Sequence, residues 1–281
     1  MSGVEGPLTG AWSNGPMSTL TSTDVEPADR LRQAAVTVAE IFCVVGTLVG
    51  VGVLGTRVVE SSGGALAADA TLLAPAGPAF AIWTPIYLGL AGFTVYQWLP
   101  AQTREPRHRA IGWLAAASML LNAAWLLVTQ QGWIWVSVVV MAALVGTLGL
   151  LVRRLQEHPS YGHGETVLVD GTFGLYLGWV AVAACANVTA AIVASGVDPG
   201  GAAAQLAAVL VLAAAAAVGV LLARRLGGRW AVAVAMAWGL LWIAWGRIAD
   251  EPRSVVVALA AVVAAVVVLV AAAREHSLAE D

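Results

Sequence analysis

Stretches of about 20 mostly apolar residues recur along this chain and restrict its fold more than any other feature. A helix needs about 20 residues to cross roughly 30 Å of hydrocarbon, and a backbone in lipid has to satisfy its hydrogen bonds internally. Only 11% of the residues are charged, fewer than the ~25% that soluble proteins carry. We therefore predict an all-α polytopic membrane protein that lies in a lipid bilayer. Its eight predicted spans are 34–56, 79–99, 110–130, 133–152, 166–195, 202–223, 230–246 and 254–273.

The basic residues predict the orientation of these spans. All 14 basic residues are arginines, and an even number of spans places three of them, Arg57, Arg247 and Arg253, on one side and the remaining 11 on the other. Positively charged residues stay on the cytoplasmic side, so we expect both termini in the cytoplasm. The lack of lysine and the many alanines and valines favour a GC-rich bacterial gene, and hence a bacterial plasma (inner) membrane.

The chain begins with a polar segment rich in glycine, serine, threonine and proline. Residues 1–29 contain neither the basic start nor the apolar core of a secretory signal, and no arginine precedes Arg30. We predict that residues 1–29 form a disordered N-terminal tail.

Aromatic residues and prolines concentrate in the uncharged stretch 75–100. A helix that began at Pro85 would be too short to span the membrane. We therefore expect it to begin near Pro78, with Pro85 in its interior, where it removes one backbone hydrogen bond and bends the axis. At 100° per residue, three rings of this helix share one face: Phe80, Trp83 and Tyr87.

Two later spans also combine rings with polar groups on one face. Asparagine is costly against lipid, so we expect the asparagines of these spans to face the interior of the bundle. We predict that the three faces converge on one site, although packing and hydrogen bonds between helices alone would produce the same pattern. The two further faces comprise Ser118, Asn122 and Trp125 in the third span, and Tyr176, Trp179, Ala183 and Asn187 in the fifth.

Glycines four residues apart predict where helices approach each other closely. Small residues at this spacing allow two membrane helices to touch along their backbones. The first span contains Gly46 and Gly50, and the fifth contains Gly174 and Gly178. We expect each pair to form a contact face.

Three short motifs resemble those of the TspO/MBR family, the tryptophan-rich sensory proteins related to the mitochondrial translocator protein (peripheral benzodiazepine receptor). They are "PAGPAFAIWTPIY" in the second span, "LNAAW" in the third and "YLGWVAVAACAN" in the fifth, in the order of the family. The resemblance covers roughly residues 34–195 and implies a TspO-like five-helix domain over 30–196. Three additional spans in 197–274, without a counterpart in that unit, and a C-terminal tail over 275–281 would follow.

The resemblance also implies a pocket inside the five-helix bundle for a flat apolar ligand such as a tetrapyrrole, with no cofactor required. In that family the loop after the first helix acts as a lid, which here is 57–77. Trp83 and Trp179 match family tryptophans associated with porphyrin binding, and we expect them to flank the ligand while two asparagines brace the walls. The candidate ligand-binding residues are Phe80, Trp83, Tyr87, Asn122, Trp125, Tyr176, Trp179, Ala183 and Asn187.

Two carboxylates at membrane depth support a different hypothesis. Glu40 lies about 12 Å along the first helix from its Arg32 end, and a carboxylate at this depth costs about 2.5–3.5 kcal/mol. Asp170 enters the fifth span from the same side. The two groups could share a polar cavity as the proton or ion path of a proton-coupled secondary transporter. Alternatively, Glu40 makes a structural polar contact and Asp170 is interfacial.

The seventh span and the remaining motifs leave several options open. Trp238, Trp242 and Trp245 share one face and could extend the aromatic pocket, form the contact of a homodimer, or belong to an interfacial belt. The chain contains no phosphate-binding glycine loop, nucleophile elbow or zinc signature, so nothing indicates a conventional enzyme or a metal site. A net charge of −3 gives no indication of a nucleic acid partner.

Overall fold

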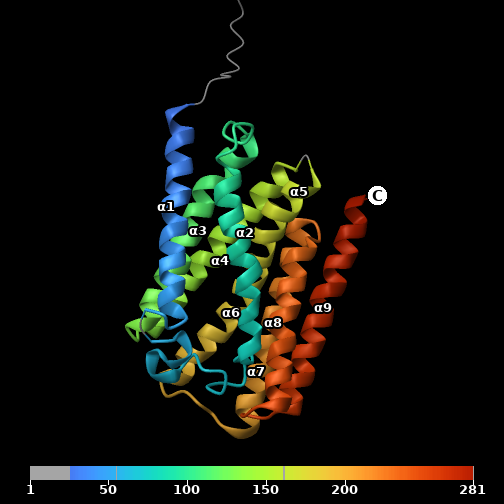
Figure 1. The fold of residues 1–281 in the computed structure, drawn as a ribbon. Helices are drawn as coiled ribbons and strands as arrows, with labels where there is room; N and C mark the ends of the chain where they lie inside the picture. Colours follow the sequence, from blue (N-terminus) through green and yellow to red (C-terminus); the bar gives the residue numbers. More distant parts are fainter. Residues whose placement is uncertain (1–25, 55, 161, 281) are drawn as a thin grey trace, which may run out of the picture.

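The computed structural model describes residues 26–54, 56–160 and 162–280, and the regular elements in these ranges are all helices (Figure 1). Eight helical segments there are long and apolar enough to cross a membrane, which confirms the prediction of a multi-pass α-helical protein. The elements are α1 (Pro27–Gly50), η1 (Val58–Glu60), η2 (Ser62–Gly64), η3 (Gly77–Ile82), α2 (Trp83–Tyr96), α3 (Pro106–Gln130), α4 (Ile134–Glu157), α5 (His163–Glu165), η4 (Thr166–Gly171), α6 (Thr172–Ala194), α7 (Gly201–Leu226), α8 (Trp230–Ala249) and α9 (Val255–Glu280).

Several helices continue past the predicted apolar runs. α1 begins at Pro27, α4 continues to Glu157 and α9 continues to Glu280. These extensions carry charged residues, which a helix tolerates where it projects beyond its apolar run. The prediction of disorder is therefore wrong for residues 27–29, which belong to α1, while residues 1–25 lie outside the described part. Most of the predicted C-terminal tail is a continuation of α9.

The helices follow one another around the bundle through pairwise packing. α1 packs on α3, α3 on α4, α4 on α6, α6 on α8, α8 on α9 and α9 on α7, while α2 lies against α1 and α6. Figure 1 shows the start of α1 and the C-terminal end of α9 at the same end of the bundle, with the loop that follows α1 at the opposite end. This arrangement agrees with an even number of crossings.

Glycines provide the closest helix contacts. A Cβ atom on Gly46 would lie 3.0 Å from the Cα of Ala123 in α3, and one on Gly178 would lie 2.2 Å from the carbonyl oxygen of Val232 in α8. The prediction that these glycines lie on contact faces is confirmed. The second contact places α8 directly on α6, which carries one of the predicted aromatic faces.

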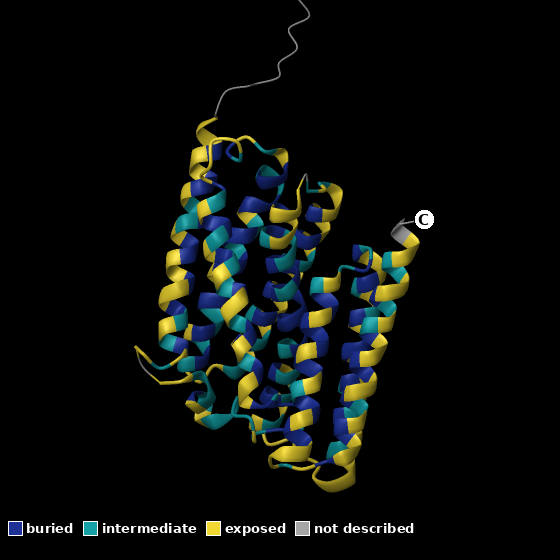
Figure 2. Ribbon diagram, turned by 45° about the vertical axis from the view of Figure 1, so that its right-hand side comes forward, coloured by how far each residue is buried: buried dark blue, intermediate teal, exposed yellow. Residues whose placement is uncertain are grey.

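The outer surface of the bundle is strongly apolar. Figure 2 shows buried residues along the inner faces of the helices and exposed residues along their outer faces. Many exposed side chains are large and apolar, including Ile41, Leu210 and Leu259. A surface with this much exposed apolar area fits a lipid environment rather than water.

The second span runs without interruption from Gly77 to Tyr96, so it begins next to Pro78 and contains Pro85, as predicted. It is the 3₁₀ helix η3 up to Ile82 and the α-helix α2 from Trp83 on, so Pro85 lies in the first turn of the α-helical part. Residues of the first turn have no intrahelical acceptor for their N–H groups, and proline is therefore accommodated without the loss of a bond.

Candidate ligand-binding site

Aromatic rings from the second and fifth spans meet in the interior of the bundle. The rings of Trp83 and Tyr87 are stacked, with centroids 5.0 Å apart. Trp83 makes edge contacts with Tyr176 at 5.7 Å and with Trp179 at 6.4 Å, and Phe80 makes one with Trp179 at 5.6 Å. The predicted convergence of these two faces is confirmed.

The third span supplies the polar contacts of this aromatic cluster. The buried Asn122 side chain donates through Nδ2 to the hydroxyl oxygen of Tyr87 at 3.1 Å and to the sulfur of Cys43 at 3.4 Å. The hydroxyl of Tyr176 donates to the backbone carbonyl of Ser118 at 3.1 Å. Asn122 faces the interior as predicted, and it connects α1, α2 and α3 behind the rings.

The second asparagine connects two other helices. Asn187 of α6 donates through Nδ2 to the hydroxyl of Ser137 in α4 at 3.0 Å, and both residues are buried. The sequence analysis did not identify Ser137, because a single serine in an apolar span has no spacing that links it to α6. Asn187 thus holds α4 against α6, as expected of a residue that braces a wall.

A small, partly open cavity of about 60 Å³ lies beside the aromatic cluster. The loop between α1 and η3 forms one wall, with residues such as Ala65, Thr71 and Pro75. The remaining predicted residues, Trp83, Tyr87, Asn122 and Tyr176, belong to the cluster next to it. Five of the predicted ligand-binding residues line the cavity itself: Phe80, Trp125, Trp179, Ala183 and Asn187.

One polar group at this cavity has an unused hydrogen bond. The indole N–H of Trp125 is buried and has no hydrogen-bond partner among the described residues. A buried donor without an acceptor costs free energy. A bound molecule with an oxygen or nitrogen acceptor would remove that cost.

The loop wall of the cavity is attached to α8. The guanidinium of Arg247 donates to the carbonyl oxygens of Thr71 at 2.7 Å and of Ala68 at 3.0 Å. Arg247 is only 1% exposed, although the sequence indicated nothing more than a position on the sparsely charged side. An arginine at the end of an apolar run carries no signal that identifies its acceptors.

The tryptophans of α8 have two different surroundings. The indole N–H of Trp238 donates to the carbonyl of Ala79 at 2.8 Å, and the rings of Trp238 and Trp242 are 5.6 Å apart. Trp245 is 58% exposed and faces outward, as a residue of an interfacial belt would. The first two tryptophans therefore contact the start of the second span without lining the cavity.

Glu40 lies in the core without a polar partner. It is 6% exposed, and neither carboxyl oxygen has a hydrogen-bond partner among the described residues. It lies close enough to interact electrostatically with Cys43, Tyr87 and Tyr176. An unpaired buried carboxyl group of this kind is costly, so Glu40 stays a candidate for a functional role.

Asp170 has entirely different surroundings. It lies in the π-helical segment η4, accepts a hydrogen bond from Arg107 at 2.5 Å and forms an ion pair with Arg229 through its other oxygen. These contacts join the start of α3 and the start of α8 to the fifth span. Glu40 shares neither arginine, so the two carboxylates do not have a partner in common.

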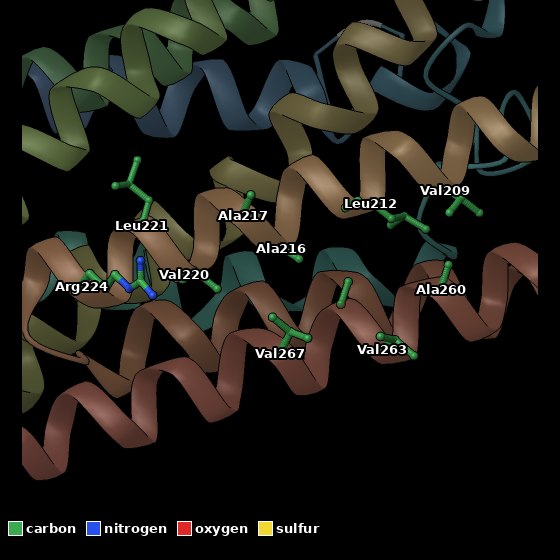
Figure 3. A pocket seen from close by; sticks show the side chains of 12 residues that line it. Val209, Leu212, Ala216, Ala217, Val220, Leu221, Arg224, Ala260, Val263 and Val267 are labelled. Carbon is green, nitrogen blue, oxygen red and sulfur yellow. The ribbon is translucent and has the colours of Figure 1, made fainter.

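Larger hollows elsewhere lie on the outer surface. Figure 3 shows a groove of about 590 Å³ between α7 and α9, which is lined by alanine, valine and leucine with Arg224 at one end. A cleft of about 1120 Å³ lies beside η4 and includes Leu88, which is 70% exposed. Neither contains any of the nine predicted ligand-binding residues. The apolar walls of the groove between α7 and α9 suit lipid chains, whereas the cleft beside η4 also includes Asp170 and Arg229.

The comparisons with known proteins agree with the geometry. Residues 34–273 match a family described as TSPO-like protein. The matched region includes the three C-terminal helices as well as the first five spans, so it is longer than the resemblance found through the three motifs. No curated protein and no solved structure matches the chain. Because the match covers well over half of the 281 residues, the chain belongs to the TSPO-like protein family.

Proposed function

We propose that this membrane protein is a receptor, transporter or sensor that binds a planar hydrophobic ligand, such as a tetrapyrrole, in the cavity beneath the 57–77 loop. The family membership supports a protein of the receptor or transporter type. The observation that carries the proposal is the cavity whose walls include Phe80, Trp125 and Trp179. Aromatic walls with few polar groups are typical of sites for large apolar molecules.

The chemistry of the walls favours a flat molecule. Each aromatic contact contributes about 0.5–1.5 kcal/mol beyond the burial of its area, and a planar ligand presents two faces and an edge to such rings. The free N–H of Trp125 would orient a ligand that carries an acceptor atom. Among the described residues that line the cavity, none has a charged side chain.

The size of the cavity requires a change of shape on binding. Sites for drug-sized ligands have volumes of about 300–1,000 Å³, whereas this cavity measures about 60 Å³. The ligand therefore enters only if a wall moves. The loop is the wall best suited to this, because the others belong to membrane-spanning helices.

The test is a binding titration of the purified protein with protoporphyrin IX, followed by quenching of tryptophan fluorescence. Phe replaces Trp in two variants, Trp83→Phe and Trp179→Phe, which keep a ring and limit the loss of packing. Trp113→Phe is the matched control, because Trp113 is 51% exposed on the outer face of α3. We expect at least a tenfold loss of affinity in the two cluster variants and none in the control. Equal affinity in all three would refute the assignment of the site.

A second candidate function is proton-coupled transport, which the unpaired and buried Glu40 favours. The two arginines bound to Asp170 argue against the participation of Asp170. The measurement is substrate flux into proteoliposomes driven by a pH gradient, with Glu40→Gln as the variant. Flux that survives this substitution would eliminate the transport hypothesis.

A further inference from the structure

The loop that forms one wall of the cavity has two differently attached parts. Its first part is bound to α3, because Ser62 donates through its hydroxyl to the carbonyl of Thr129 at 2.9 Å and Gln130 donates to the carbonyl of Thr56 at 2.8 Å. Its second part begins after Gly64. The residues at the boundary between the two parts determine how the second part, which forms the cavity wall, can move.

The second part of the loop is held by α8. Arg247 binds the carbonyls of Thr71 and Ala68, and the backbone N–H of Ala76 donates to the carbonyl of Trp242 at 3.2 Å. Trp238 adds its bond to Ala79. Among the described residues, these four hydrogen bonds are the ones that join residues 65–79 to a distant part of the chain.

Two glycines lie at the boundary between the parts. Gly63 and Gly64 have φ values of +67° and +81°, in the region that other residues rarely adopt. No atom lies within 4 Å of the position of a Cβ on either one. Such residues allow large changes of backbone angle at low cost, as the hinges of closing loops do.

The part held by α8 is also the part that faces the cavity. Of the loop residues in the cavity wall, all but Val58 follow Gly64. Release of the bonds to α8 would therefore let residues 65–76 swing about the two glycines and open the cavity. As long as the bonds persist, the space remains too small for a planar ligand.

We propose that α8 acts as a latch, which means that its hydrogen bonds hold residues 65–76 of the loop over the cavity. Arg247 is the residue that positions this wall and thereby controls access to the cavity. The role of the latch in ligand entry rests on the proposed function, whereas its role in holding the loop does not. One of the three C-terminal helices would thus contribute to the ligand site that the first five spans form. It also explains why an arginine is buried at this point of an apolar helix.

The first arm of the test needs no ligand and measures hydrogen–deuterium exchange of the purified full-length protein. Arg247→Met keeps the apolar stem and removes both donors, and exchange of the peptide that covers residues 68–76 is expected to rise about tenfold or more. Arg247→Lys retains one charged donor and should give an intermediate rate. Arg253→Met is the matched control, because the side chain of Arg253 on the same side of the bundle is 67% exposed.

The second arm measures how fast protoporphyrin IX associates with the same proteins in stopped-flow fluorescence. We expect Arg247→Met to associate about tenfold faster than the parent and Arg253→Met to be unchanged. If Arg247→Met does not fold, Trp238→Phe replaces it, since this change removes only the bond to Ala79 and should raise exchange by a smaller factor.

The outcomes separate the latch from the proposed function. Unchanged exchange of residues 68–76 in Arg247→Met overturns the latch, whatever the binding result. Raised exchange without porphyrin binding by any of the proteins supports the latch and counts against the proposed ligand. Raised exchange with an unchanged association rate overturns the control of access by Arg247.

Discussion

The contact between α6 and α8 predicts a large effect of a single added methyl group. In Gly178→Ala, the new Cβ atom would lie 2.2 Å from the carbonyl oxygen of Val232 and 2.9 Å from the Cβ of Ala235. Carbon atoms rarely approach closer than about 3 Å, so the helices must separate by about 0.8 Å. The opposing atom belongs to the backbone and cannot rotate away.

Two opposing effects determine how much Gly178→Ala changes the free energy of unfolding. Overpacking of this kind costs about 1–3 kcal/mol, and the rigid carbonyl places this site at the upper end. Alanine recovers up to about 1 kcal/mol relative to glycine in a helix. We therefore expect Gly178→Ala to lower the free energy of unfolding by about 2 kcal/mol.

The matched control is Gly149→Ala in α4, where no atom lies within 4 Å of the added Cβ. It has the same change in helix propensity without the clash, so we expect equal or slightly higher stability. The assay is reversible unfolding in mixed detergent and SDS micelles, followed by tryptophan fluorescence. Free energies of unfolding that agree within about 0.5 kcal/mol between the two variants would refute the close contact of α6 and α8.

Three further predictions address the cavity and its supports. Trp125→Phe removes the free indole N–H and should weaken protoporphyrin binding about threefold to tenfold in a fluorescence titration; unchanged affinity would mean that the ligand does not accept from this group. Asn122→Leu removes the bond from α3 to the hydroxyl of Tyr87 and should cost about 1 kcal/mol in detergent unfolding, a loss that a stability equal to the parent would contradict. Asp170→Asn removes the carboxylate that Arg229 pairs with and leaves Arg107 only the longer pair with Glu165 at 3.7 Å, so it should cost about 3 kcal/mol. Arg153→Gln breaks only an exposed pair and should cost less than ~1 kcal/mol; similar losses in both would disprove the anchoring role of Asp170.

The sequence predicted the elements of this protein well because lipid imposes strict local rules. A run such as 254–273 has to be helical if it crosses a bilayer, and α9 occupies it. The faces that carry Trp83 and Trp179 could also be assigned, because the helical repeat alone places residues on a face. The helix ends were less accurate, since charged residues continue a helix past the apolar run.

Sequence reasoning failed where a residue acts on a distant segment. The sequence predicted a helix that begins near Pro78, which the segment Gly77–Tyr96 confirms, but it gave no sign that the residues up to Ile82 form a 3₁₀ helix. Asp170 looked like a possible partner of Glu40, yet its bonds go to Arg107 and Arg229. In each case the deciding contact or backbone geometry has no pattern within the local sequence.

The amino-acid sequence by itself determined that the chain crosses a membrane as a bundle of eight helices, and it determined which faces of three of them carry rings and amides. These properties depend on hydropathy and on the helical repeat, which are local. Only the tertiary structure decided that a cavity of about 60 Å³ lies beside the aromatic cluster and that Arg247 of α8 holds the loop that forms one of its walls. Those properties depend on the fit between segments separated by more than 170 residues in the chain, and that fit is set by packing in three dimensions.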